Sequence, residues 1–159
     1  MTTKDEIIES LGLILHPEGG WYKEVYRSED KIDTIDRNLL TSIYFLIDDQ
    51  NVSNFHRIKS DELWFFHLGT PLTVHVLDKE AGHQKRIVGN DISKGESPQV
   101  LVKKDMIFGS SLEDRKGFAL VSCAVAPGFD FEDFELFTKK ELLSQFPNEQ
   151  EIINKMTAT

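Results

Sequence analysis

Short runs of apolar and β-branched residues recur through the middle of the chain, and turn-forming residues separate them at short intervals. Runs of roughly four to eight such residues between turn signals are typical of β-strands. No helical periodicity interrupts the series, so the pattern predicts an antiparallel sandwich or barrel. The strands that we expect lie at 21–28, 41–47, 62–68, 72–77, 84–88, 99–102, 106–110 and 118–125.

The predicted strand at 21–28 differs from the others because both of its faces carry polar residues. Strict alternation along a strand puts Arg27 on the face opposite Tyr22 and Glu24. Polar side chains on both faces indicate that one face lines a polar cavity. An exposed edge strand is the alternative interpretation.

Helical patterns occur only at the two ends of the chain. Thr3 and Glu6 have the spacing of a capping box, in which each side chain satisfies a free amide at the helix start, and Thr138 and Glu141 repeat it. No repeat, linker or low-complexity segment divides the chain, so we expect one domain. The predicted parts of this single domain, 1–159, are a barrel core at about 13–137 and terminal helices at about 3–12 and 138–156.

Charge and composition exclude several classes of partner. The 159 residues carry a formal net charge of −9, and an acidic surface repels the phosphate backbone of nucleic acid. No stretch approaches the roughly 20 apolar residues that a membrane span needs, and the first residues contain no apolar signal region. We therefore expect a cytoplasmic protein that binds neither nucleic acid nor membrane. The single cysteine, Cys123, lies in an apolar run and is predicted to be buried in the core.

The stretch at 53–69 is the most informative for function, because it spaces His56, Glu62 and Gly69 six and seven residues apart. With the segments 16–22, 24–28, 42–46, 95–99 and 126–136, it resembles the fifth cupin family, small single-domain cupins whose biochemical role is not settled. The resemblance runs from about residue 8 to about residue 137. It implies a jelly-roll barrel, usually a homodimer, similar in fold to the deoxysugar nucleotide epimerases. It also implies that His56 and Glu62 point into one cavity.

Two positions depart from the usual cupin pattern of metal ligands. Ile58 stands where the first cupin motif has a second His, and Phe108 stands where the second motif has a His. A transition metal normally takes three or four side-chain ligands. We therefore expect no bound metal. The alternative is a divalent transition metal on His56 and Glu62, with His67 or His75 added if the strand register turns one of them inward.

Without a metal, His56 and Glu62 take a different role. The epimerases that share this barrel use an inward His to remove a proton next to a carbonyl, and His56 lies in the equivalent motif. An imidazole titrates near neutral pH, which suits a general base, and Glu62 is the candidate carboxylate to orient it. The alternative is a hydrogen-bonded pair that only closes the barrel.

Arginines and aromatic residues supply the candidate ligand contacts. Arg27 and Arg57 have the planar guanidinium that binds carboxylate or phosphate, although an exposed position explains each equally well. Aromatic side chains stack on sugar rings and bases, or else fill the core. The aromatic candidates are Tyr44, Trp64, Phe66 and Phe108.

The remaining histidines are interpreted from strand alternation and turns. His75 faces either the cavity or the outside of the barrel, toward solvent or a partner subunit, and the pattern leaves both open. We expect His67 outside the pocket, His83 solvated in a turn and His16 in a structural role beside a turn. The acidic run at 130–135 alternates with phenylalanines and is expected to be an amphipathic closing segment.

These observations together predict a homodimeric cupin that binds a small polar ligand, such as a sugar or sugar nucleotide. It isomerises or epimerises that ligand without a metal, with His56 as the base. A non-catalytic binding or sensing module that uses the same pocket is the second interpretation. A metal-dependent oxygenase or isomerase is the third. Nothing in the sequence separates an enzyme from a binder.

Overall fold

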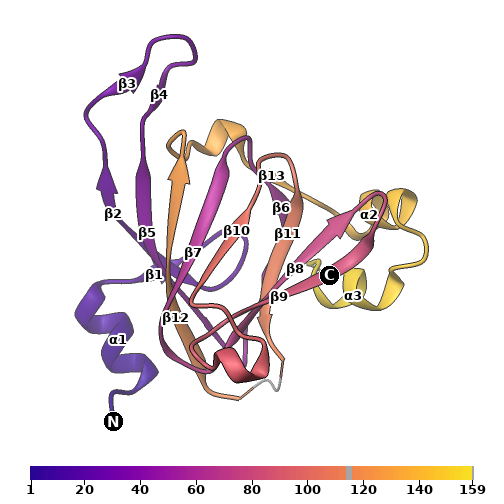
Figure 1. Ribbon diagram of the computed structural model, residues 1–159, viewed down its shortest axis with the longest axis horizontal. Helices are drawn as coiled ribbons and strands as arrows, with labels where there is room; N and C mark the ends of the chain where they lie inside the picture. Colours follow the sequence, from indigo (N-terminus) through magenta and orange to yellow (C-terminus); the bar gives the residue numbers. More distant parts are fainter. Residues whose placement is uncertain (114–115, 159) are drawn as a thin grey trace.

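A computed structural model describes residues 1–113 and 116–158, and within them two antiparallel sheets face each other (Figure 1). The larger sheet has the order β1 (Ile14–Leu15), β2 (Trp21–Arg27), β5 (Thr41–Asp48), β12 (Phe118–Ala126), β7 (Asp61–Gly69) and β10 (Gln99–Val102). The smaller sheet has the order β13 (Glu135–Leu136), β6 (Ser53–Arg57), β11 (Ile107–Leu112), β8 (Leu72–Asp78) and β9 (Gly82–Val88). This arrangement is the predicted jelly-roll.

Smaller elements connect and extend the sheets. The hairpin of β3 (Lys31–Ile32) and β4 (Arg37–Asn38) projects beyond the barrel between β2 and β5 (Figure 1). Short 3₁₀ turns lie at η1 (Ile92–Lys94) and η2 (Phe131–Asp133). In the part of the chain that the structure describes, no helix is long and apolar enough to cross a membrane.

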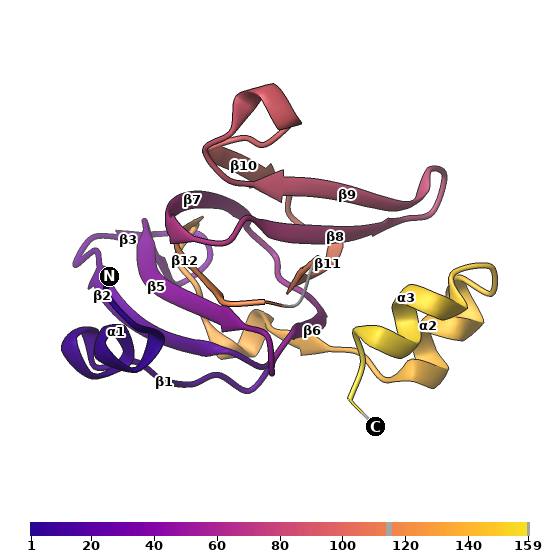
Figure 2. The same cartoon turned by 90° about the horizontal axis from the view of Figure 1, so that it is seen from below.

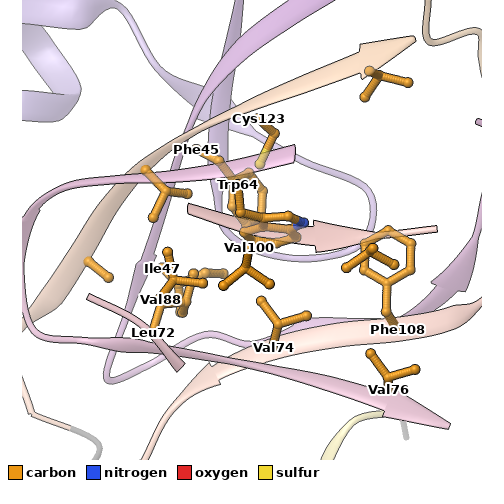
Figure 3. Packing of buried hydrophobic residues seen from close by; sticks show 14 of the residues in the cluster. Phe45, Ile47, Trp64, Leu72, Val74, Val76, Val88, Val100, Phe108 and Cys123 are labelled. Carbon is orange, nitrogen blue, oxygen red and sulfur yellow. The ribbon is translucent and has the colours of Figure 1, made fainter. Parts of the chain in front are cut away.

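The core lies between the two sheets and consists of the inward-facing residues of both (Figure 3). Alternation along each strand sends every second side chain into this space, as β-sheet geometry requires. Cys123 is 2% exposed there, which confirms the prediction of a buried thiol, and burial raises its pKa well above the usual value. The labelled members of the cluster in Figure 3 are Phe45, Ile47, Trp64, Leu72, Val74, Val76, Val88, Val100, Phe108 and Cys123.

The helices cover the outer faces of the sheets, and Figure 2 shows them on opposite sides of the molecule. The first helix, α1 (Lys4–Leu11), packs on the larger sheet, whereas α2 (Lys139–Gln145) and α3 (Gln150–Lys155) pack on the smaller one. Both predicted capping boxes are present, at Thr3 and at Thr138. Each box satisfies amides that the first helical turn leaves without a partner.

A β-bulge changes the expected facing of β2. The pairing of β2 with β5 shifts register between Glu24 and Tyr26, so one extra residue is accommodated on β2. Strict alternation was therefore the wrong assumption for this strand. Tyr22, Glu24 and Arg27 border the same cavity, although alternation placed Arg27 on the opposite face.

Candidate functional site

A cavity of about 400 Å³ opens between the sheets and contains the candidate chemistry. Residues from β2, β5, β6 and β7 form its inner walls, and the segments 16–18 and 129–134 complete them. Of the expected site residues, His56, Glu62 and Arg27 lie here. The full lining is His16, Glu18, Tyr22, Glu24, Arg27, Ile43, His56, Ile58, Glu62, Phe129, Asp130, Phe131 and Phe134.

Glu18 is the residue that sequence reasoning missed. It lies in the turn before β2, where its carbonyl accepts a hydrogen bond of 2.7 Å from the amide of Asn54 on β6. The next residue, Gly19, has a φ of +108°, and a β-carbon there would collide with the backbone oxygen of Val52. Glycine is therefore needed to bring this turn against β6, and the turn places the Glu18 side chain beside His56. The signal in the sequence that could have identified Glu18 was a glutamate followed directly by two glycines.

Glu18 and His56 form a buried ion pair. The Oε2 atom of Glu18 lies 2.8 Å from Nε2 of His56, and the two residues are 6% and 3% exposed. The other ring nitrogen, Nδ1, lies 2.7 Å from the carbonyl oxygen of Asn54, which can only accept. His56 thus donates from both nitrogens.

The pKa values of the pair follow from this geometry. Burial opposes charge on both groups, but the attraction and the hydrogen bond between them outweigh it. The pKa of His56 is raised and that of Glu18 is lowered, so we assign an imidazolium and a carboxylate at neutral pH. Glu62 was expected to orient His56, and that expectation is wrong. The orienting groups are Glu18 and the carbonyl of Asn54.

Glu62 occupies the same cavity in a different state. It lies on β7 opposite Val102 and Val125 and is 8% exposed. Burial raises its pKa to about 8, with the negative charge of Glu18 adding to the rise and His56 opposing it. The indole N–H of Trp64 also favours the charged form, although it makes no hydrogen bond of ordinary geometry. Glu62 is therefore mostly protonated at neutral pH while Glu18 beside it is ionised.

His16, which was expected to be structural, also lines the cavity. Its Nδ1 accepts a hydrogen bond of 3.1 Å from the backbone amide of Glu18, which leaves the proton of the neutral ring on Nε2. Burial lowers its pKa, so this imidazole is neutral at pH 7. Its ring meets Tyr22 edge to face at a centroid distance of 4.5 Å. The fold fixes both the tautomer and the orientation of His16.

The mouth of the cavity carries charges that are already paired. Arg27 donates two hydrogen bonds to Glu24, at 2.6 and 3.2 Å, and one each to Asn38 and to the carbonyl of Phe129. Its guanidinium therefore has little capacity left for a ligand anion. The segment 129–134 forms the adjoining wall with three phenylalanines in mutual edge-to-face contact. This agrees with the amphipathic closing segment predicted for 130–135.

Five other expected contacts do not reach the cavity. Trp64 and Phe108 are buried in the core, at 2% and 1% exposure, and Phe66 packs against that core, so core packing was the correct alternative for them. Phe108 still touches the site from behind, since its ring lies 4.2 Å from that of His56. Tyr44 points to the outer face of the larger sheet, in the cluster under α1. Arg57 lies outside the barrel and pairs with Glu135 at 2.7 Å.

His75 lies in a second cavity, of about 590 Å³, on the outer face of the smaller sheet beside α3. It is 1% exposed and contacts Ser111 and His83 through its two ring nitrogens, at 2.8 and 2.9 Å. His83 is half-buried by this contact, so the expected solvated position is wrong. His67 is exposed and lies outside the first cavity, as expected.

The donor groups of the first cavity do not fit a tightly held metal ion. Over residues 1–113 and 116–158, no three or more His, Cys, Asp or Glu side chains are placed to hold one. His56 uses both of its nitrogens within the protein, and Ile58 and Phe108 occupy the two positions where the cupin pattern has a further His.

The family model described as "Cupin superfamily (DUF985)" matches residues 5–137, which is most of the chain. The chain belongs to this family. The predicted resemblance to the small cupins of unsettled role is thereby confirmed.

Three relatives of this cupin come from different organisms, and two of them match it over almost the whole length of both chains. An uncharacterised protein of Saccharomyces cerevisiae is 32% identical over 147 residues, covering 80% of this chain and 72% of its own. A hypothetical protein from Leishmania major is 38% identical with a TM-score of 0.94, covering 99% of this chain and 100% of its own. A protein from Shewanella oneidensis is 43% identical with the same TM-score, covering 99% of both chains.

A more distant similarity concerns the fold alone. Oxalate decarboxylase from Bacillus subtilis matches with a TM-score of 0.57 at 16% identity, over 91% of this chain and 37% of its own. At that identity the match supports the jelly-roll architecture and carries no argument about chemistry.

Proposed function

We propose that this cupin binds a small polar molecule in the cavity beside His56 and shifts a proton on it, as an isomerase or epimerase that needs no metal. One observation carries the proposal. An ionised carboxylate, Glu18, and a protonated one, Glu62, line the same buried cavity. Neighbouring groups whose pKa values are pushed apart are the usual arrangement of a catalytic base and acid.

The base of this proposal is the His56–Glu18 pair. The doubly donating His56 cannot accept a proton while it is charged, so a proton from the ligand goes to an oxygen of Glu18. His56 then acts by holding Glu18 in place and stabilising its charge. The sequence predicted His56 as the general base; in this proposal Glu18 takes that role, and His56 orients Glu18 in place of the expected partner, Glu62.

The acid of this proposal is Glu62. A carbon–hydrogen bond of the ligand breaks with its proton going to Glu18, and the released electron pair moves to an acceptor atom of the ligand. That atom takes the proton of Glu62. The second half reverses these transfers: Glu18 returns a proton to a carbon of the ligand, and Glu62 takes one back from the acceptor side. Both groups are thereby restored, and no oxidant or reductant is required.

The second candidate is a non-catalytic binding or sensing module. The arginines favour this candidate over turnover of a sugar nucleotide, because Arg27 at the mouth and Arg57 outside the barrel were both expected to grip a phosphate and both are bound to carboxylates. A sugar nucleotide thus stays an expectation of the family resemblance. A binder and an isomerase use the same cavity and differ only in proton exchange.

Proton NMR in D₂O separates the two candidates. A panel of small polar ligands is first screened for binding, and each bound ligand is then followed for loss of a carbon-bound proton signal. An isomerase exchanges that proton, and Glu18→Gln and Glu62→Gln each abolish exchange while the fold is retained. Binding with no exchange in any bound ligand identifies the binding module. Undiminished exchange in both variants contradicts the assigned roles.

A further inference from the structure

The charges around the first cavity are unbalanced in favour of carboxylates. Four carboxyl groups border it, whereas Arg27 is the one arginine or lysine among its lining residues. His56 adds a second positive charge, but Glu18 and the carbonyl of Asn54 already accept from its two ring nitrogens. Every cation of the lining is thus already bound within the protein. The four carboxyl groups belong to Glu18, Glu24, Glu62 and Asp130.

Of the four carboxyl groups, Glu62 is the one without a cationic partner among the residues that the structure describes. Glu18 pairs with His56, Glu24 with Arg27, and Asp130 lies 3.9 Å from Arg37. Among the residues that the structure describes, Glu62 has no ion-pair partner, although it is 92% buried and borders the cavity. Ionising an unpaired carboxyl group in this buried position is costly, and a ligand that brings a positive charge offsets that cost and allows Glu62 to ionise.

The walls of the cavity suit a flat organic ligand. Tyr22, Phe129, Phe131 and Phe134 line it, and the rings of Phe131 and Phe134 meet edge to face with centroids 5.9 Å apart. Phe131 is 51% exposed, so its ring is accessible at the rim. The faces of aromatic rings attract organic cations as well as planar ligands. A volume of about 400 Å³ is at the small end of ligand cavities.

The surroundings of the mouth disfavour phosphate. Arg37 lies between Asp133, at 2.8 Å, and Glu132, at 3.3 Å. A phosphate would have to displace Glu24 from Arg27 and then lie near Glu18 and Asp130. Repulsion between like charges in a partly buried site makes that exchange unfavourable.

We infer that the ligand of this cavity is a planar organic nitrogen base, bound as its cation against Glu62 and the aromatic wall, and not a phosphorylated sugar. The inference rests on the proposed function only in taking this cavity as the ligand site. It is also compatible with the proposed acid, because a basic nitrogen that takes the proton of Glu62 becomes the cation that pairs with it.

The test uses three ring compounds of similar size and different charge: benzamidine, a planar cation at pH 7; benzamide, its neutral counterpart; and phenyl phosphate, an anion. Methyl-labelled protein is titrated at constant ionic strength, and the signals of Ile43 and Ile58 report binding because both residues line the cavity. We expect benzamidine to bind at least about tenfold more tightly than benzamide, and phenyl phosphate to give no saturable shift.

Two variants assign the effect to Glu62. Glu62→Gln should bring the affinity for benzamidine down to that for benzamide and leave benzamide binding in place. Glu149→Gln, in the second cavity, should change neither. The inference is overturned if phenyl phosphate binds as tightly as benzamidine. It is also overturned if the preference for the cation survives in Glu62→Gln, or if benzamidine shifts neither the Ile43 nor the Ile58 signal. The titration tests the class of ligand, and the proton-exchange experiment tests the proposed reaction. Either one can therefore be refuted while the other stands.

Discussion

Replacing Glu62 by glutamine should make the protein more stable at alkaline pH, although it removes a residue of the site. The pKa of Glu62 is raised to about 8 in the folded protein by burial, against 4.5 for an unperturbed group. Below pH 4.5 both the folded and the unfolded chain hold this proton, so the group contributes nothing. Between pH 4.5 and 8 the unfolded chain releases the proton and the folded chain keeps it, so the free energy of unfolding falls as pH rises.

The magnitude follows from the width of that window. Each pH unit corresponds to about 1.4 kcal/mol, so two and a half units give a penalty of about 3 kcal/mol at pH 7. Above pH 8 the penalty is constant at about 5 kcal/mol. Glutamine keeps the shape of the protonated side chain and cannot ionise. The variant should therefore match the wild type near pH 4.5 and exceed it increasingly up to pH 8.

Urea unfolding of both proteins at pH 5, 6, 7 and 8 measures this difference. Titrating groups that do not interact with Glu62 cancel because only the difference between the two proteins is compared. Equal m-values verify that the unfolding reaction is unchanged. Glu9→Gln, at an exposed position of α1, is the matched control and should show no such trend. A difference that is flat with pH, or that grows toward acid, would refute the assignment of a protonated Glu62.

Three further predictions concern other parts of the molecule. Glu18→Gln removes the charge that raises the pKa of His56, so the imidazole should titrate at lower pH by NMR; an unchanged titration would contradict the ion pair. Burial lowers the pKa of His75 to about 3, so the unfolded chain binds this proton first and the free energy of unfolding should fall by at most about 1.4 kcal/mol per pH unit below pH 6.5. His75→Asn removes this group and should flatten the dependence of stability on acid pH. A variant whose stability falls as steeply as that of the wild type would contradict the buried, neutral His75. We also propose a homodimer, because the apolar side chains of Ile14 and Leu15 on β1 are 61% and 67% exposed and a second copy would cover them. Light scattering should give twice the chain mass. A monomeric mass at micromolar concentration would exclude the dimer.

Sequence alone was sufficient where the deciding interactions are local. The capping boxes at Thr3 and Thr138 depend on side chains three residues apart, and both formed as predicted. The apolar run around Cys123 was enough to predict its burial, and alternation along one strand was enough to place His67 outside the cavity. The spacing of His56 and Glu62 on successive strands identified the family and brought both residues to one cavity.

Only the tertiary structure decided which groups interact there. A turn that is distant in sequence supplies Glu18 to His56, because Gly19 allows the backbone of that turn to meet β6. A bulge in β2 moves Arg27 to the cavity side, and pairing with Glu24 then occupies its guanidinium. Charge partners and pKa values depend on distances and burial that arise when separate strands pack, and no local pattern encodes them. The chain thus specifies its barrel strand by strand, whereas the chemistry of its cavity exists only once the barrel has closed.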